Sequence, residues 1–348
     1  MYLSTARPWF SFLVHPRDIR DLDTIRAASL LRRYSDTEQE YVAKACTLPP
    51  LVLGDVRVRG EQVLGEVVCA VRMPEQMMLA EGMTAVVESA LLAVQRGTAL
   101  IGLGALTAPA MGGGTRLLRH LPAQVKVTNG NGYTAAVTRD NVREAIDYLG
   151  LGGRPRVAVV GSTGSVGGAA SRLLAEEDID LVLLGRTEQR VRHLLGDLEG
   201  RATLTADLDV VKTADVVVTL THDRTAELTP ERLTPDTVVI DVAAPYNIAP
   251  SRRPEFAQAG IAVVKGGLAH IPGFRCVHDF DLPAAEDTFA CLAETYLMAR
   301  EGLFENSVGR PTADYARRMS ELATRYGVRS RSIAGDIDRA IGAASKEI

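Results

Sequence analysis

The sequence predicts an α/β protein: a doubly wound parallel Rossmann sheet with an N-terminal α/β substrate domain and a helical C-terminal segment. Within residues 156–187 an apolar β-branched run, a glycine-rich turn, a helix and a second strand follow one another, as in a βαβ unit. Strands and helices then alternate up to about residue 270, which is typical of a parallel sheet. The 348 residues also exceed what one hydrophobic core usually holds. We therefore expect a substrate domain over 1–153, a Rossmann domain over 154–270 and a helical segment over 271–348.

Residues 1–153 do not repeat the Rossmann pattern. Short apolar runs predict strands there, and apolar residues at helical spacing predict helices. The expected strands cover 9–14, 62–71, 99–106 and 124–128, and the expected helices cover 74–96 and 142–149. Three consecutive glycines at 112–114 indicate a loop, with a mobile lid as the alternative, and 150–155 reads as a linker.

The glycine-rich turn after the apolar run 157–160 predicts a nucleotide site. Its Gly-x-x-Gly-x-x-Gly spacing lets the chain turn tightly, brings bare backbone against a pyrophosphate and packs the next helix close to the sheet. That helix, expected over about 165–176, directs its positive N-terminus at the phosphates. The residues expected at the cofactor are Gly161, Ser162, Thr163, Gly164, Ser165, Val166 and Gly167. The alternative is a packing unit of the same form that binds no nucleotide.

The end of the second strand, 180–184, predicts which dinucleotide binds. An NAD site usually has a carboxylate there for the ribose 2′-hydroxyl. This chain instead has Arg186 and Thr187, without a nearby carboxylate at the strand's end. A guanidinium suits a 2′-phosphate, so we expect NADPH as the cofactor. The alternative is a solvated Arg186 and a protein that takes either dinucleotide.

The later strands predict the rest of the crevice. They are expected over 202–206, 215–220, 237–242 and 261–264, and ligands of doubly wound sheets bind beyond the carboxyl ends of the strands. The crevice residues expected there are Thr219, Leu220, Thr221, His222, Ala243 with 244–246, and Gly266 with 267–270. His222 fits an exposed loop histidine better than a catalytic one. His270 follows a double glycine at the crevice edge and is a catalytic candidate.

The composition is that of an ordinary globular protein and argues against several other classes. With 46% hydrophobic residues, 24% charged residues and a net charge of −4, the chain gives no sign of a nucleic-acid partner. The four cysteines lie far apart without zinc or disulfide spacing, so no metal site is expected. The apolar run at 9–14 is too short for a signal peptide or a membrane span. These observations predict a reducing, cytoplasmic setting.

The C-terminal segment contains the most informative run for chemistry. Helices are expected over 283–304 and 313–326, and the chain reads Asp-Phe-Asp-Leu-Pro at 279–283 and Phe-Ala-Cys-Leu-Ala-Glu at 289–294. This run resembles the long-chain acyl-[acyl-carrier-protein] reductases of the cyanobacterial type, which have Phe-Ala-Cys-Phe-Ala-Glu after an Asp-(Val/Ile)-Pro stretch. The resemblance covers about 9–333 and departs from the family pattern at Tyr133, His270 and Tyr326. Further similar segments are 12–15, 103–105, 130–135, 161–167, 185–186, 266–267 and 309–310.

The resemblance implies NADPH-dependent reduction of a fatty acyl thioester to an aldehyde, with the thioester delivered by acyl carrier protein or coenzyme A. It also implies that Cys291 carries the acyl group and that no metal is needed. On the predicted helix Cys291 lies about 200° round from Phe289, so its thiol is expected to point away from the apolar face, toward a cleft or solvent. The alternative for Cys291 is a small buried hydrophobic residue. The catalytic candidates are therefore Cys291 and His270.

Two other functions stay open. A shikimate-dehydrogenase-like oxidoreductase would share the domain order but would use a Lys and Asp pair; Lys126 is available, whereas 131–134 offers no acidic partner. The second function that stays open is that of a non-catalytic NADP-binding protein. Basic residues near the C-terminus suggest a docking face for an acidic carrier protein, or else a solvated basic helix. They are Arg317, Arg318, Arg325, Arg329 and Arg331.

Overall fold

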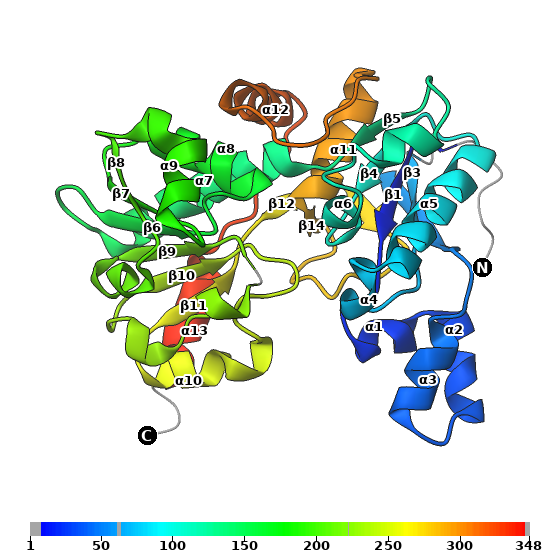
Figure 1. Ribbon diagram of the computed structural model, residues 1–348, viewed down its shortest axis with the longest axis horizontal. Coiled ribbons are helices and arrows are strands. Elements are labelled where there is room, and N and C mark those ends of the chain that lie inside the picture. Colours follow the sequence, from blue (N-terminus) through cyan, green and yellow to red (C-terminus); the bar gives the residue numbers. More distant parts are fainter. Residues whose placement is uncertain (1–7, 61–63, 222, 345–348) are drawn as a thin grey trace. The chain divides into compact units, whose positions relative to one another are not determined.

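The chain folds into two compact units. The computed structural model describes residues 8–60, 64–221 and 223–344. Unit 1 comprises Met1–Gly130, Ile271–Gly309 and Tyr326–Val328, and unit 2 comprises Asn131–His270, Arg310–Arg325 and Arg329–Ile348. The chain therefore passes between the units several times, as the colours of Figure 1 show.

The unit boundaries differ from the expected domains at 1–153, 154–270 and 271–348. The first boundary lies at residue 130, because helix α7 (Asn131–Leu149) packs on the sheet of unit 2 through Val142 and Ala145. The C-terminal segment is not a separate domain. Its part 271–309 belongs to unit 1, and most of the remainder belongs to unit 2.

Unit 1 is built on a six-stranded mixed sheet with the order β13-β2-β3-β1-β4-β5. The neighbours β3, β1, β4 and β5 are parallel, and β2 runs antiparallel to β3 and β13. Every residue of β3 and β4 is buried, as is usual in parallel sheets. Of the predicted strand 62–71, residues 62 and 63 lie outside the described part. The strands are β1 (Phe10–Val14), β2 (Leu51–Val58), β3 (Gly65–Cys69), β4 (Leu100–Leu103), β5 (Lys126–Thr128) and β13 (Phe274–Cys276).

Helices pack on both faces of this sheet. On one face, residues of α5 (Ala80–Gln95) join the same buried cluster as Leu13 and Ile101. On the other face Gly102 leaves room for α11 (Ala290–Glu301), orange in Figure 1, since a Cβ on Gly102 would lie 2.1 Å from Thr295 Oγ1. The other elements are α1 (Ile19–Thr24), α2 (Arg26–Leu31), α3 (Glu38–Ala45), α4 (Pro74–Met77), α6 (Thr107–Ala110), β14 (Asp287–Phe289) and 3₁₀ turns at Arg32–Tyr34 and Leu117–His120.

The helix expected over 74–96 is interrupted between α4 and α5. Leu79 has an extended backbone, with φ −89° and ψ 169°, and is the N-cap of α5. Gly82 permits the sharp change of direction, because a Cβ there would lie 2.4 Å from the Gln76 carbonyl oxygen. The apolar periodicity continues through the break, which is why the sequence pattern does not reveal it.

Unit 2 confirms the predicted doubly wound parallel sheet. Its strand order is β11-β10-β9-β6-β7-β8, and every pairing is parallel. The order reverses between β6 and β9, where a doubly wound sheet binds its ligand. Buried clusters cover both faces of the sheet. The strands are β6 (Arg156–Val160), β7 (Asp180–Leu184), β8 (Ala202–Thr205), β9 (Val216–Thr219), β10 (Val238–Asp241) and β11 (Ala262–Lys265).

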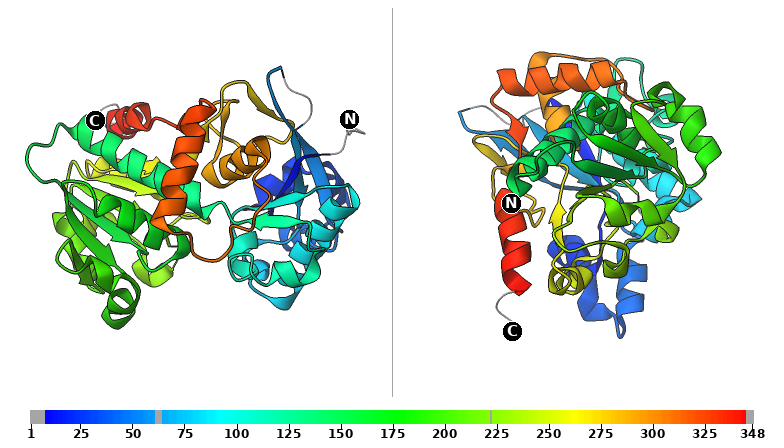
Figure 2. Two further views of the ribbon diagram at one scale, coloured as in Figure 1. Left: turned by 90° about the horizontal axis from the view of Figure 1, so that it is seen from above. Right: turned by 90° about the vertical axis from the view of Figure 1, so that its left-hand side faces the viewer.

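A C-terminal helix, which lies in the segment expected to be helical but whose bounds the sequence analysis did not give, completes unit 2. α13 (Ala334–Ala344), red in Figure 2, packs on β11 and α10 and buries Ile337. Glu144 on α7 accepts the N–H groups of Ile333 and Ala334 at the start of this helix. The other elements are α8 (Ser165–Leu174), α9 (Glu188–Leu195), α10 (Arg253–Gln258), α12 (Ala313–Arg325), β12 (Leu268–His270), β15 (Arg329–Ser330) and 3₁₀ turns at Gly196–Leu198, Leu208–Thr213, Arg224–Ala226, Pro230–Arg232 and Pro250–Arg252.

In the part of the chain that the structure describes, none of the helices combines the length and the apolarity that crossing a membrane requires.

Candidate cofactor crevice and candidate nucleophile

The glycine turn between β6 and α8 has the geometry of a phosphate-binding loop. Gly161 has φ +91°, and a Cβ there would lie 3.0 Å from the Leu220 carbonyl carbon. A Cβ on Gly167 would lie 2.3 Å from the Gly161 carbonyl oxygen, so only glycine lets α8 come this close to the turn. Gly164 is the N-cap of α8 and offers no side-chain cap, so a phosphate can cap the first turn.

The predicted cofactor residues divide into those that line the crevice and those behind it. A crevice of about 1130 Å³ opens at the carboxyl ends of β6, β7 and β9. The predicted residues that line it are Gly161, Thr163, Gly164, Arg186, Thr187, Leu220 and Thr221. The predicted residues outside its lining are Ser162, Ser165, Val166, Gly167, Thr219, Ala243 and Gly266. His222 lies outside the described residues.

Several residues behind the lining hold the crevice walls. Ser162 is buried, and its hydroxyl donates to the Leu184 carbonyl oxygen at 2.9 Å, which ties the turn to β7. Asn131 Nδ2 donates to Ser165 Oγ at 2.9 Å and so joins α7 to α8. These residues shape the crevice, and their contact with a cofactor stays a prediction.

Arg186 is paired with a carboxylate that the sequence analysis did not anticipate. Its Nε and Nη2 donate to Asp223 Oδ2 at 3.0 and 2.6 Å. Hydrogen bonds from Thr225 and Arg186 lower the pKa of Asp223 to about 2. The expectation of an Arg186 without a nearby carboxylate is therefore wrong, because the loop after β9 brings Asp223 to the end of β7.

Two further arginines line the crevice without a carboxylate. Arg310 Nη2 donates to the Thr163 carbonyl oxygen at 2.9 Å, within the glycine turn. Burial and the neighbouring Arg190 and Arg172 lower the pKa of Arg310. Among the described residues, neither Arg190 nor Arg310 forms an ion pair. Uncompensated like charges at this position attract an anion.

A buried carboxylate organises the loops beyond β9 and β10. Asp241 is fully buried, and its Oδ1 accepts the Thr219 hydroxyl at 2.7 Å and the N–H of Ala243 at 3.2 Å. The N–H groups of Asn247 and Ile248 also donate to this carboxylate at 3.3 Å. The sequence analysis missed Asp241 because it ends an apolar strand and belongs to no recognised motif.

Cys291 occupies the first turn of α11 in unit 1. The helix begins at Ala290 and not at residue 283, because Phe289 is extended, with φ −69° and ψ 141°. The predicted apolar face shared by Phe289 and the helix is therefore wrong. Cys291 is partly exposed, and the direction of its thiol stays a prediction. A helix N-terminus stabilises a thiolate placed in its first turn.

Gly130 packs directly against Cys291. A Cβ on Gly130 would lie 2.2 Å from Cys291 Cβ and 2.3 Å from its Cα, and Gly130 has φ +69°. Gly130 follows β5 by two residues, so Cys291 lies near the carboxyl end of that strand. The adjacent glycines 112–114 form a loop that Asn129 fixes, since its Nδ2 donates to the carbonyl oxygens of Gly113 and Gly309 at 3.0 and 2.9 Å.

Burial affects the other three cysteines. Cys46 and Cys69 are buried, and burial raises the pKa of both thiols. Burial also raises the pKa of Cys276 to about 12. Because a thiol reacts as its thiolate, these three are poor nucleophiles at neutral pH.

An aromatic row that the sequence analysis missed leads to the start of α11. The rings of His278 and Phe280 meet edge to face at 4.9 Å between centroids, and those of Phe280 and Phe289 at 5.6 Å. Burial lowers the pKa of His278, which favours its neutral imidazole. His270, the predicted catalytic histidine, belongs to unit 2, so its pairing with Cys291 stays a prediction.

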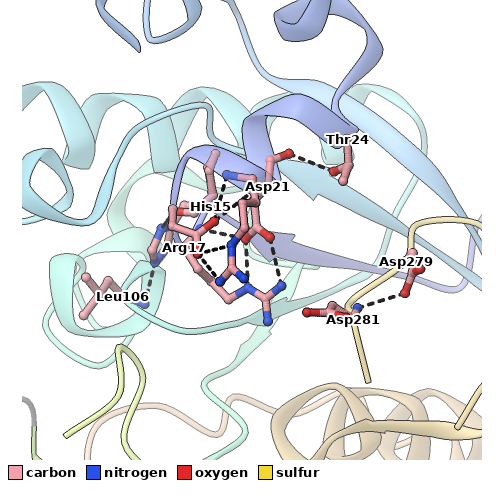
Figure 3. Close-up of polar contacts among 10 residues, drawn as sticks. His15, Arg17, Asp21, Thr24, Leu106, Asp279 and Asp281 are labelled. Carbon is pink, nitrogen blue, oxygen red and sulfur yellow. Dashed lines mark hydrogen bonds and ion pairs between the residues drawn. The ribbon is translucent and has the colours of Figure 1, made fainter. Parts of the chain in front are cut away.

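His15, in one of the segments that carry the resemblance, has a structural role (Figure 3). Its Nδ1 donates to the Pro16 carbonyl oxygen at 2.7 Å, and the Leu106 N–H donates to its Nε2 at 3.2 Å. These bonds require the neutral ring, and burial lowers the pKa of His15 to about 4. His15 thereby ties the segment after β1 to the segment after β4. Arg17 and Asp21 form a two-bond ion pair beside it, with both distances 2.8 Å.

Among the residues that the structure describes, no three His, Cys, Asp or Glu side chains form a group that could hold a metal ion.

Comparison with known proteins supports the assignment of the crevice. Residues 156–296 match the protein family described as "Semialdehyde dehydrogenase, NAD binding domain". The curated protein "Aminotransferase PigE" of Serratia sp. is 29% identical over 244 residues, which are 67% of this chain and 28% of that protein. The chain thus spans little more than a quarter of that relative's length.

Two solved structures have a weak likeness to this chain. L-tryptophan dehydrogenase from Nostoc punctiforme is 14% identical with a TM-score of 0.42, covering 97% of this chain and 90% of that one. The dipicolinate synthase A chain from Bacillus subtilis is 14% identical with a TM-score of 0.38, and the likeness covers 85% of this chain and 96% of that one. At such TM-scores these likenesses carry no argument.

The strand order, the glycine turn and the family match agree on the function of unit 2. It contains a Rossmann-type NAD(P)-binding domain like that of dehydrogenases.

Proposed function

We propose that this protein is an NADPH-dependent reductase that converts an acyl thioester to an aldehyde through an acyl-enzyme on Cys291. The observation that carries the proposal is a partly exposed thiol in the first turn of α11, packed on the bare backbone of Gly130. The match to a semialdehyde dehydrogenase domain extends to residue 296 and includes Cys291, and its name points to aldehyde chemistry. The resemblance of 289–294 to the acyl-[acyl-carrier-protein] reductases points to the same residue.

The residues support a two-stage reaction. Cys291 Sγ attacks the thioester carbonyl carbon, the new C–S bond forms, and the carrier leaves as a thiol after taking up a proton. Bound NADPH supplies the hydride that reduces the acyl group to the level of an aldehyde. Cys291 then departs as a thiolate, which the positive end of α11 stabilises, and the aldehyde is released. His270 stays the proposed proton donor.

The crevice in unit 2 would hold the cofactor. The glycine turn and the N-terminus of α8 suit the pyrophosphate. Arg190 and Arg310 suit the 2′-phosphate, because both line the crevice and neither is paired with a carboxylate of the described residues. Arg186 is held by Asp223 and contributes a second, weaker positive contact. These charges favour NADPH over NADH.

The proposed substrate is a fatty acyl thioester of acyl carrier protein or coenzyme A. Of the basic residues suggested as a docking face, Arg317 pairs with Glu176 at 2.6 Å and also with Asp314. That pairing weakens the docking interpretation for Arg317. The dehydrogenase alternative gains no support at Lys126, whose Nζ donates to the Ala123 carbonyl oxygen at 2.7 Å.

Intact-protein mass after incubation with acyl thioesters in the absence of NADPH tests the proposal. We expect the wild type to gain one acyl group, and Cys291→Ser to gain none and to form no aldehyde when NADPH is added. Cys276→Ser is the matched control, because the Cys276 thiol is also partly exposed but has a raised pKa. Aldehyde formation by a folded Cys291→Ser protein would exclude the covalent mechanism.

A further inference from the structure

Unit 1 buries a carboxylate one helical turn after the proposed nucleophile. Glu294 is on α11, three residues after Cys291, and has no exposed surface. Its Oε1 accepts the hydroxyl of Thr128 at 2.6 Å and that of Ser307 at 3.4 Å. A buried carboxylate destabilises the fold unless hydrogen bonds compensate for its lost hydration. Its presence at this position therefore needs an explanation.

The hydrogen bonds at Thr128 run from the backbone to the carboxylate. Thr128 Oγ1 accepts the N–H of Gly130 at 3.1 Å and donates its own proton to Glu294. The donor role of Thr128 needs an acceptor, and an O–H···O distance of 2.6 Å is typical of a charged one. Glu294 thereby fixes the hydroxyl of Thr128, and Thr128 fixes the amide of Gly130.

The position of Gly130 limits the space around Cys291. Its Cα is so close that a Cβ would lie 2.2 Å from Cys291 Cβ. A rotation of the Gly130 amide therefore changes the space around the thiol directly. The φ of +69° at Gly130 is open to a glycine in several neighbouring conformations, so the amide needs an anchor to stay in one.

The preceding loop has separate anchors. Asn129 donates its N–H to the Ser307 carbonyl oxygen at 2.9 Å, and its side chain binds the carbonyl oxygens of Gly113 and Gly309. The two bonds from the Asn129 side chain do not involve Glu294, whereas Ser307 is itself bound to Glu294 through its hydroxyl at 3.4 Å. Thr128, held by Glu294, binds the amide of Gly130, the residue whose Cα packs against Cys291.

We infer that Thr128 and Glu294 are positioning residues for Cys291, which they set for attack on the thioester through the amide of Gly130. The inference rests on the proposed role of Cys291 as nucleophile. Neither residue contacts the substrate in this account, and neither exchanges a proton with it.

Three substitutions in the full chain distinguish the effect of the Thr128 hydroxyl from effects of side-chain volume and of the Glu294 charge. Thr128→Val removes the hydroxyl at nearly constant volume, Thr128→Ser keeps it, and Glu294→Gln keeps an acceptor oxygen without the charge. Ser89→Ala is the control, because Ser89 is also buried in unit 1 and its hydroxyl donates to the Ala85 carbonyl oxygen. The measurements are the rate of Cys291 acylation by lauroyl-coenzyme A, the KM for that ester, and the rate of Cys291 alkylation by iodoacetamide.

Thr128→Val is expected to slow both acylation and alkylation by about 10- to 100-fold with KM unchanged, the size of effect that misplacement of a reacting group by about 1 Å produces. Thr128→Ser and Ser89→Ala should react like the wild type, and Glu294→Gln should lie between. Wild-type rates in Thr128→Val, or equal loss in Thr128→Ser, would overturn the inference. If the wild type forms no acyl adduct with any thioester, the proposed function fails, and the alkylation rates still decide the positioning role.

Discussion

The arginines at the end of β7 differ in whether a carboxylate pairs with them. Arg186 is bound by Asp223, although its side chain is 77% exposed. Arg190 and Arg310 have no such partner within the described chain, and burial and the charges of Arg190 and Arg172 lower the pKa of Arg310. A phosphate monoester placed between them would remove this repulsion. Under the proposed preference for NADPH, we therefore expect the affinity for its 2′-phosphate to depend more on Arg190 and Arg310 than on Arg186.

We expect Arg190→Ala and Arg310→Ala each to weaken NADPH binding by about tenfold or more, with little effect on NADH, because a charge-assisted hydrogen bond contributes about 1.5 to 3 kcal/mol. Arg186→Ala should have a smaller effect. Arg192→Ala is the matched control, since Arg192 also lines the crevice but pairs with Glu188 and Glu199. Fluorescence titration with NADPH and with NADH measures the ratio of the two dissociation constants in each variant. Loss of NADPH preference in Arg186→Ala alone would contradict this assignment.

At this scale the sequence predicts residue types better than contacts. The glycine turn is predictable because each glycine answers a local backbone requirement, as Gly161 and Gly167 show. Asp223 lies 37 residues from Arg186 in the chain, and no local pattern connects them. The same holds for Thr128 and Glu294, which are 166 residues apart.

The sequence predicts the presence of strands and helices well, but it predicts the residue at which a helix begins poorly. The apolar runs of β6, β7 and β9 mark buried strands, since parallel strands are covered on both faces. The start of α11 is misplaced by seven residues, because Pro283 and the acidic residues after it also fit a helix start. α7 begins at Asn131, well before the predicted residue 142, because asparagine and glycine there suggest a turn.

The hydrogen bonds of His15, which join the segments after β1 and β4, should make the free energy of unfolding depend on pH. His15 is buried as the neutral ring with a pKa of about 4, against an ordinary value of 6.5. The unfolded chain therefore binds more protons at His15 between these values, and stability falls as the pH drops from 6.5 to 4. The full difference corresponds to about 3 kcal/mol. Stability at neutral pH is unaffected by this titration.

Urea unfolding between pH 4 and pH 7 measures this dependence. His15→Asn should be less stable than the wild type at pH 7 and should show a smaller loss on acidification. His120→Asn serves as the control, because His120 is exposed on a 3₁₀ turn. An equal pH slope in the wild type and in His15→Asn would show that His15 does not cause the loss.

For the whole molecule, the class of fold follows from the sequence but the division of the chain does not. Alternating strands and helices are enough to predict the doubly wound sheet of unit 2. The boundaries depend on which distant helices cover the sheet. Val142 and Ala145 from α7, and Ile333 and Ile337 near the C-terminus, belong to the same buried cluster as the strands. A linear domain division at 153 and 270 separates these residues from their core.

The fragment 154–270 is therefore expected not to fold, because it exposes the sheet face that α7 and α13 cover. A chain in which 131–270 is joined by a flexible linker to 310–344 keeps those helices and Arg310, and it should unfold cooperatively and bind 2′,5′-ADP. Circular dichroism during urea unfolding and calorimetric titration with 2′,5′-ADP distinguish the two chains. The joined chain with Arg310→Ala is the control, since it should fold equally well and bind the nucleotide more weakly. Cooperative unfolding and nucleotide binding by 154–270 alone would show that the cover of α7 and α13 is dispensable and that the linear division describes an independent domain.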